Sequence, residues 1–236
     1  MRPREPGTKA PRERGMRGSG RLIAVIGLDG SGKTTLAREL VETLREEGYR
    51  VCYLHVWPRI PRLRPSPPRG SGAPRSRPPS SLPRLPLGRA VLLLLLLWGI
   101  FCIRLPYLLR RYDVVVCDRF LHDLVTYLQL RGRNGMAATL LHLGRSLLPQ
   151  AILWLRVSQE VLAARKGAER EHAPEVYARW DRLYEELVSA VPAWRRVTRP
   201  LDGALPVSEL REVARAWIRK AWETGSEPSA SKGRTS

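Results

Sequence analysis

The sequence contains few cysteines, comparatively few acidic residues and no apolar run at its start. Its three cysteines, Cys52, Cys102 and Cys117, are far apart, and an odd number of separated thiols argues against a disulfide framework and for a reducing compartment. Residues 1–20 are charged and rich in Pro and Gly, so we expect a disordered basic arm rather than a secretory signal. Zinc-ligand spacings and internal repeats are also missing. These absences predict a cytoplasmic protein without disulfides.

The charge is strongly positive. Lys and Arg number 41 against 22 Asp and Glu, a net charge of +19, and much of the excess lies in residues 1–20 and 59–89. Such a balance permits binding to nucleic acid or to anionic membranes, and it also suits arginines gathered around phosphates. Because no RNA-binding signature or interleaved aromatic platform is present, nucleic acid is not expected to be the partner.

The sequence Gly27-Leu28-Asp29-Gly30-Ser31-Gly32-Lys33-Thr34 fits the phosphate-binding pattern G-x-x-x-x-G-K-[ST]. An apolar run precedes it and an amphipathic run follows it, which is the strand–loop–helix context that the pattern requires. The glycines let backbone N–H groups surround a polyphosphate at a helix start. In this pattern the lysine reaches the β- and γ-phosphates and the hydroxyl binds Mg²⁺. The residues assigned to ATP are Gly27, Asp29, Gly30, Ser31, Gly32, Lys33, Thr34 and Thr35.

Apolar and amphipathic segments alternate along the chain, which predicts an α/β fold. The expected strands are 21–26, 50–56, 113–117, 151–157 and 195–198. The expected helices are 33–47, 87–110, 120–130, 136–147, 159–168, 174–191 and 207–222. We therefore predict one domain over 21–222, a three-layer P-loop NTPase sandwich with a five-stranded parallel sheet flanked by helices. Within it, 57–86 is a Pro/Arg/Ser-rich loop, and 223–236 is a disordered tail.

The segment Ala90–Ile103 is a run of 14 uncharged residues. A membrane span needs about 20 such residues, so this length favours a buried core helix or a dimer interface. A helix lying on a membrane surface is the second interpretation, and a true span is the third.

Two further motifs carry charge suited to phosphate chemistry. Asp118 ends a strand that is apolar throughout, where a P-loop enzyme holds Mg²⁺, so Thr34 and Asp118 are the predicted metal ligands. The adjacent Arg119 can bind a phosphate through two parallel hydrogen bonds. A basic cluster, Arg165 to Arg170, follows the fourth strand and could act as a mobile lid on the transferring phosphoryl group. The alternatives are that Asp118 caps the next helix and that the basic cluster is a solvated helix end.

Together these pieces resemble the thymidylate kinase family of nucleoside monophosphate kinases. The matching residues are the loop from Gly27 to Thr35, Asp118-Arg119-Phe120, the segment 153–161, the lid at 165–170 and Tyr184-Glu185-Glu186-Leu187. The resemblance implies transfer of the ATP γ-phosphoryl group, with Mg²⁺, to a nucleoside monophosphate. It implies catalytic roles for Lys33, Asp118, Arg119, Arg165 and Arg170, and acceptor contacts from Asp29, Arg119 and Tyr127.

The sequence departs from the family on the acceptor side. Ile26 stands where a glutamate is usual, and His55-Val56-Trp57-Pro58-Arg59 replaces Arg-Glu-Pro-Gly, with Arg59 as a substitute phosphate ligand. His122, Asp123 and Leu124 replace small hydroxyl residues near the base. We therefore expect a kinase acting on a dTMP-like nucleotide or a related small phosphorylated acceptor. The alternative is an ATP-binding regulator or membrane-associated adaptor with a degenerate acceptor site. Homodimerisation and peripheral membrane contact through 87–110 remain open.

Overall fold

The computed structural model describes residues 20–57, 85–144, 147–166 and 172–224. In this part of the chain, five strands form a single parallel sheet with the order β2-β3-β1-β4-β5. The strands are β1 (Arg21–Gly27), β2 (Val51–His55), β3 (Val114–Asp118), β4 (Ala151–Arg156) and β5 (Thr198–Asp202). The predicted α/β fold with a five-stranded parallel sheet is confirmed.

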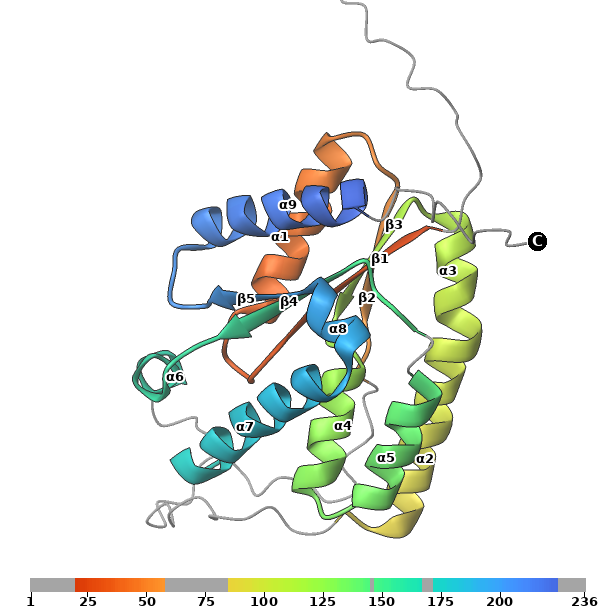
Figure 1. Cartoon of the computed structure of the whole chain (residues 1–236), viewed down its shortest axis with the longest axis vertical. Helices are drawn as coiled ribbons and strands as arrows, with labels where there is room; N and C mark the ends of the chain where they lie inside the picture. The colour runs from red at the N-terminus through yellow and green to blue at the C-terminus, as the bar shows by residue number, and fades with distance from the viewer. Residues whose placement is uncertain (1–19, 58–84, 145–146, 167–171, 225–236) are drawn as a thin grey trace, which may run out of the picture.

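Helices cover both faces of this sheet (Figure 1). They are α1 (Lys33–Glu46), α2 (Leu87–Trp98), the π-helical segment η1 (Gly99–Arg104), α3 (Leu105–Arg111), α4 (Leu121–Leu130), α5 (Asn134–Gly144), α6 (Gln159–Lys166), α7 (Pro174–Ala190), α8 (Pro192–Val197) and α9 (Val207–Thr224). Helices α1 and α9 pack side by side on one face, and α2 to α5, α7 and α8 lie on the other. Right-handed crossovers explain this division. The connection from β1 to β2 runs towards one edge of the sheet and places α1 on one face, whereas the connections from β2 to β3, β3 to β4 and β4 to β5 run towards the other edge and place their helices on the opposite face.

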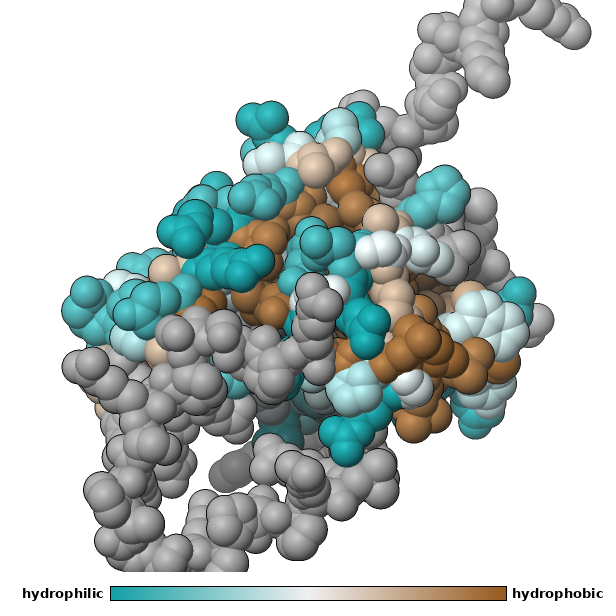
Figure 2. Space-filling view, turned by 90° about the horizontal axis from the view of Figure 1, so that it is seen from below, coloured by the Kyte–Doolittle hydropathy of each residue, from teal (hydrophilic) through white to brown (hydrophobic). Residues whose placement is uncertain are grey.

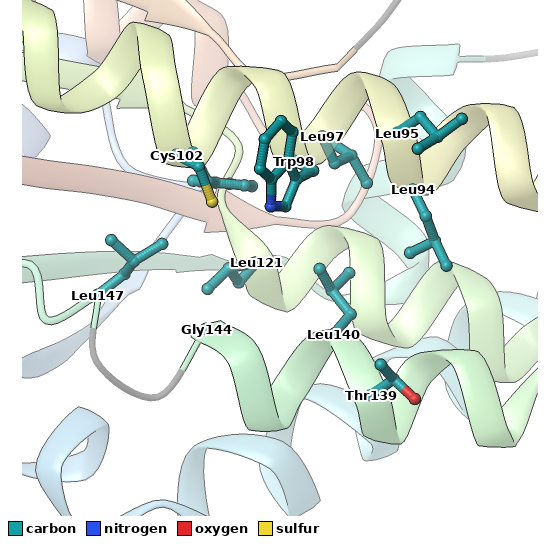
Figure 3. Close-up of a pocket in the computed structure, with 11 residues that line it drawn as sticks. Leu94, Leu95, Leu97, Trp98, Cys102, Leu121, Thr139, Leu140, Gly144 and Leu147 are labelled. Carbon is teal, nitrogen blue, oxygen red and sulfur yellow. The ribbon is translucent and has the colours of Figure 1, made fainter.

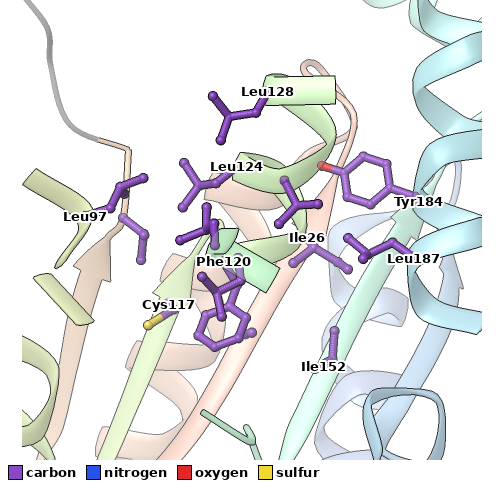
Figure 4. Close-up of a cluster of buried hydrophobic side chains, with 14 of the residues drawn as sticks. Ile26, Leu97, Cys117, Phe120, Leu124, Leu128, Ile152, Tyr184 and Leu187 are labelled. Atoms are coloured by element: carbon purple, nitrogen blue, oxygen red, sulfur yellow. The ribbon is translucent and has the colours of Figure 1, made fainter. Parts of the chain in front are cut away.

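Alternate residues of β1 point into two separate hydrophobic cores. Ile23 and Val25 pack with α1 and α9, whereas Ala24 and Ile26 face the opposite helices. A strand buried on both faces is apolar throughout, which explains the uninterrupted run in the sequence. In Figure 4, Ile26 lies among side chains of α4 and α7, including Tyr184. The central strand is therefore fixed from both sides, and so is the loop that follows it.

The position of the last strand differs from the prediction. Residues 192–197 form α8, and the strand occupies 198–202 instead of 195–198. Pro192 lies in the first turn of α8, where its missing N–H costs nothing, and Trp194 is fully buried. Pro200 lies within β5, and an edge strand tolerates proline because one side of its backbone makes no ladder. The helix predicted at 174–191 correspondingly ends at Ala190.

The Leu-rich segment is one continuous helix of 25 residues, Leu87–Arg111, formed by α2, η1 and α3. Within the described chain it is the one helix long and apolar enough to cross a membrane by length and composition. Its inner face, including Leu93 and Leu97, belongs to the core. Its outer face is exposed, so the prediction of a core helix holds for one face alone.

His122 of α4 is buried in an apolar environment. Its ring centroid lies 4.2 Å from that of Trp194, and neither ring nitrogen has a hydrogen-bond partner among the described residues. Burial lowers the pKa of His122 from 6.5 to about 3. The folded protein therefore keeps this ring neutral at a pH where the unfolded chain protonates it.

We expect His122 to destabilise the fold in mild acid. Below pH 6.5 the unfolded chain binds a proton at His122 that the folded chain does not, so the free energy of unfolding decreases as the pH falls from 6.5 towards 3. In His122→Leu, the free energy of unfolding should decline less steeply between about pH 6 and 4, by roughly 1.4 kcal/mol per pH unit. Urea unfolding at several pH values measures this slope. An equally steep decline in His122→Leu would contradict the interpretation.

Candidate active site

The turn after β1 depends on glycine conformations. Gly27, Gly30 and Gly32 have φ values of 141°, 93° and 96°, a region that other residues rarely adopt. A Cβ atom on Gly27 would lie 2.4 Å from the carbonyl oxygen of Leu155 in β4. The turn therefore passes close to the neighbouring strand and leads directly into α1, whose first N–H groups favour an anion.

The ammonium group of Lys33 lies across this turn. The side chain is 4% exposed, and Nζ donates a hydrogen bond of 2.5 Å to the carbonyl oxygen of Leu28. The same Nζ lies 3.6 Å from Asp29 Oδ1. Burial, followed by the positive charge of Arg119, lowers the pKa of Lys33. The predicted phosphate-binding lysine is thus held inside the glycine-rich turn.

Asp118 lies at the carboxyl end of β3, between the ends of β1 and β2. Strand register places it beside Val25 of β1 and His55 of β2. Its Oδ2 accepts hydrogen bonds of 2.7 Å from the hydroxyl groups of Thr34 and Tyr53, and His55 Nδ1 lies 3.1 Å away. The two predicted metal ligands, Thr34 and Asp118, are therefore in direct contact.

Hydrogen bonding keeps this buried carboxyl group ionised. Burial by itself raises the pKa of Asp118, but the hydrogen bonds from Tyr53, Thr34 and His55 outweigh it, so the pKa lies below its usual value. The other oxygen, Oδ1, has no hydrogen-bond partner among the described residues. A buried anionic oxygen without a partner is a suitable ligand for a cation. Because Mg²⁺ prefers oxygen ligands, the residues at this site are compatible with Mg²⁺.

Across the described residues, no group of three or more His, Cys, Asp and Glu side chains could hold a metal ion. Mg²⁺ commonly uses one or two carboxylates, several waters and substrate phosphates instead of a closed protein cage. A single carboxylate beside a threonine hydroxyl is consistent with that mode.

Arg119 has an unusual backbone conformation, and its side chain lies beside two carboxylates. Its φ is 73°, which costs a non-glycine residue energy and indicates that its surroundings determine the conformation. The guanidinium group forms an ion pair with Asp29, and its Nη1 lies 3.6 Å from Asp123 Oδ1. Burial lowers the pKa of Arg119, but the charges of Asp123 and Asp29 outweigh it and raise the pKa overall. Arg119 therefore remains charged beside Asp29, the residue predicted to contact the substrate that accepts the phosphoryl group.

Asp123 is a central residue of this group, which the sequence places near the acceptor's base but without a role. It is fully buried, its Oδ2 accepts a hydrogen bond of 3.1 Å from the backbone N–H of Phe120, and its Oδ1 accepts one of 2.9 Å from the hydroxyl of Tyr184. Burial raises its pKa, although the positive charge of Arg119 opposes this. The one local signal is its place in the first turn of α4, where a carboxylate caps the helix start.

Tyr127 joins the site through Trp57. The two rings meet edge to face with centroids 5.0 Å apart, and the guanidinium carbon of Arg119 lies 5.1 Å from the Trp57 ring centroid. The structure thus brings Tyr127 and Arg119 to the same aromatic side chain. The second predicted phosphate ligand, Arg59, lies outside the described residues.

Arg165, near the end of α6, also contacts the glycine-rich turn. Its Nη1 donates to the carbonyl oxygen of Ser31 at 3.4 Å, and its Nη2 to that of Gly203 at 2.7 Å. Arg170, the other catalytic residue predicted in the lid, lies outside the described residues. These two hydrogen bonds hold the Arg165 side chain, near the end of α6, against the turn.

A cavity of about 320 Å³ opens beside the turn. Gly30, Ser31, Gly32 and Thr35 form one wall, and the remaining lining residues are Leu36, Arg165, Gly203, Leu205, Val207 and Leu210. Four of the predicted ATP-binding residues thus border a hollow with apolar walls contributed by the segment after β5 and the first turn of α9.

No model of a known protein family matches this chain. A search of curated proteins finds no match either. The site is therefore interpreted from its own geometry.

Replacing Gly27 by alanine should destabilise the protein by about 3 kcal/mol or more. The new Cβ atom would combine an unfavourable positive φ with a backbone clash at Leu155. Chemical denaturation measures the change.

Gly48→Ala is the matched control, because Gly48 has a φ of 90° and no atom within 4 Å of the position of the new Cβ. It should cost only about 1–2 kcal/mol, from backbone strain alone. Equal losses of unfolding free energy in the two variants would contradict the prediction, because they would show that the close approach of the turn to β4 adds nothing to the cost of Gly27→Ala.

Proposed function

We propose that this chain is a P-loop NTPase of the thymidylate kinase type. It would use ATP and Mg²⁺ to transfer the γ-phosphoryl group to a nucleoside monophosphate, dTMP-like, or to a related small phosphorylated acceptor. The observation that carries the proposal is the 2.7 Å hydrogen bond from Thr34 Oγ1 to Asp118 Oδ2. It joins the end of a G-x-x-x-x-G-K-T turn to a buried carboxylate at the tip of the adjacent strand, which is the arrangement that nucleoside triphosphate chemistry requires.

On the donor side, the turn from Gly27 to Gly32 would surround the ATP phosphates with backbone N–H groups. Lys33 would exchange its hydrogen bond to the Leu28 carbonyl for one to a phosphate oxygen. The cavity next to Thr35 would receive the nucleoside part of ATP. Thr34 and Asp118 would hold Mg²⁺, which supplies neutralisation of the charge on the phosphates.

On the acceptor side, the fixed groups are Arg119, Asp29 and the ring of Trp57. The guanidinium of Arg119 can bind the acceptor phosphate through two parallel hydrogen bonds. Asp29 lies next to it and would contact the acceptor's sugar. Trp57 and Tyr127 offer aromatic faces on which a base can stack, a contact that tolerates different bases.

Phosphoryl transfer through a loose transition state needs positioning and positive charge more than a general base. Lys33, Arg119 and Arg165, each of which contacts a residue of the glycine-rich turn, would supply that charge. Arg165, the first residue of the predicted lid, reaches the turn from the end of α6. The group thus has the cations that a transferring phosphoryl needs without an arginine in the turn itself.

Lys33→Ala and Asp118→Asn should each lower ATP turnover with a competent acceptor by at least about a hundredfold. Both variants remove charge that stabilises the transferring group or its metal. The measurement is ADP release with Mg²⁺ and a panel of nucleoside monophosphates that includes thymidylate. Asp113→Asn is the matched control, because Asp113 lies just before β3, far from the site, in an exposed ion pair with Arg50. It should leave turnover unchanged.

Full turnover in Lys33→Ala would contradict the proposal. Binding of ATP without turnover on any member of the panel would instead favour the alternative, a nucleotide-binding regulator. Calorimetry distinguishes these two outcomes, because it measures ATP binding in the absence of a phosphoryl acceptor.

A further inference from the structure

The outer face of the Leu87–Arg111 helix carries most of the exposed large apolar side chains of the described residues. We call this surface the α2–α3 face. Of twelve such side chains, eight lie here: Leu87, Val91, Leu92, Leu95, Leu96, Trp98, Ile103 and Tyr107. Figure 2 shows a continuous apolar area on the right of the molecule, the side on which α2 and α5 lie in Figure 1. Scattered apolar residues are ordinary on a protein surface, but a continuous patch of this kind indicates an interaction site.

The inner face of the same helix excludes a membrane span in the folded protein. Ala90, Leu93, Leu97 and Leu105 are at most 1% exposed and belong to the core that covers the sheet. Inserting the helix across a bilayer would remove these side chains from that core. The helix can therefore meet a membrane only by lying along its surface, with its outer face towards the lipid.

A cavity of about 210 Å³ opens at this face, between α2, η1, α4 and α5 (Figure 3). Leu95, Trp98 and Cys102 of the outer face contribute to its lining, which is apolar apart from the hydroxyl of Thr139. Phe101, which also lines the cavity, packs edge to face on Phe120 with ring centroids 5.5 Å apart. A cavity with so few polar groups suits a hydrocarbon chain.

The charges around the α2–α3 face identify the partner. Arg89, Arg104, Arg110 and Arg111 are exposed at its two ends, and the sequence from 57 to 112 contains no acidic residue. The adjoining segment 134–150 contains none either. A second copy bound through this face would bring like charges together without a compensating carboxylate. An anionic surface would complement them.

We propose that the α2–α3 face binds the surface of membranes that contain anionic phospholipids. Leu92, Leu95 and Leu96 enter the acyl region, the arginines at the two ends bind phosphate headgroups, and Trp98 lies at the boundary. The apolar cavity accommodates part of an acyl chain. This surface is separate from the residues assigned to ATP, so its test does not depend on the proposed kinase activity.

Co-sedimentation of the full chain with vesicles tests the proposal. Binding should be strong with phosphatidylcholine mixed with phosphatidylglycerol and weak with phosphatidylcholine alone. The triple variant Leu92→Gln/Leu95→Gln/Leu96→Gln should lower the partition coefficient by at least about tenfold, because three apolar side chains lose their burial. Val213→Gln, which removes an exposed apolar residue on α9, is the matched control and should bind as the wild type does.

The contribution of charge is tested by Arg104→Glu/Arg110→Glu. Each reversal removes an attraction to the anionic surface and adds a repulsion, so binding should fall by about tenfold or more. Arg195→Glu/Arg196→Glu makes the same change in net charge on α8 and should have a much smaller effect. Brominated lipid should quench the fluorescence of Trp98, and this quenching should disappear in Trp98→Phe.

Circular dichroism and thermal unfolding confirm that each variant folds, and the Trp98 experiment needs no disruptive substitution. Unchanged binding of the triple variant, or no quenching that depends on Trp98, would overturn the proposal. Sedimentation showing a dimer that the triple variant dissolves, without vesicle binding, would assign the face to a second copy and would equally overturn it.

Discussion

The hydrogen bond between Thr34 and Asp118 joins two segments 84 residues apart, and the geometry of the candidate site depends on it. Two features of the fold produce it. Parallel pairing of β1 and β3 brings their carboxyl ends together, with Asp118 beside Val25. Positive φ angles at Gly27, Gly30 and Gly32 then turn the chain so that α1 begins above the same edge. Tyr53 and His55, from the next strand, complete the environment of the carboxylate and keep it ionised. The ends of three adjacent strands thus supply one anionic centre.

The cations of the site are each held by a nearby oxygen. Lys33 donates to the carbonyl of Leu28, Arg119 pairs with Asp29, and Arg165 donates to the carbonyl of Gly203. These contacts already order the three side chains near the turn. Binding of a ligand would therefore cost less side-chain entropy than if the side chains were free to rotate. Under the proposed function, phosphate oxygens replace or share these partners. Asp123 has a supporting role, because it pairs with Arg119 while Tyr184 and the start of α4 hold its own oxygens.

The sequence predicts those parts of the fold that depend on local patterns. The apolar strands and the glycine-rich turn follow from periodicity and motif context, and the same motifs single out Thr34 and Asp118, although the hydrogen bond between them is seen only in the structure. The strand at 198–202 is misplaced in the prediction because Pro200 argues against a strand unless its edge position is known. The contacts of Asp123, Tyr53 and Trp57 are missed for a different reason: Tyr184, Asp118 and Tyr127, which they meet, lie far along the chain, and only the fold brings them together. The inner and outer faces of the Leu-rich helix also cannot be separated from sequence, because nearly every residue is apolar.

The most direct test of the central claim is the Mg²⁺ dependence of ATP binding, measured by calorimetry on the wild type and on Asp118→Asn. If Asp118 and Thr34 form the metal site beside the phosphate-binding turn, Mg²⁺ should tighten ATP binding to the wild type. The same addition should have little effect on Asp118→Asn, which should still bind free ATP through Lys33 and the backbone N–H groups. Binding of ATP that gains equally from Mg²⁺ in both proteins, or no binding to folded wild type, would contradict this account.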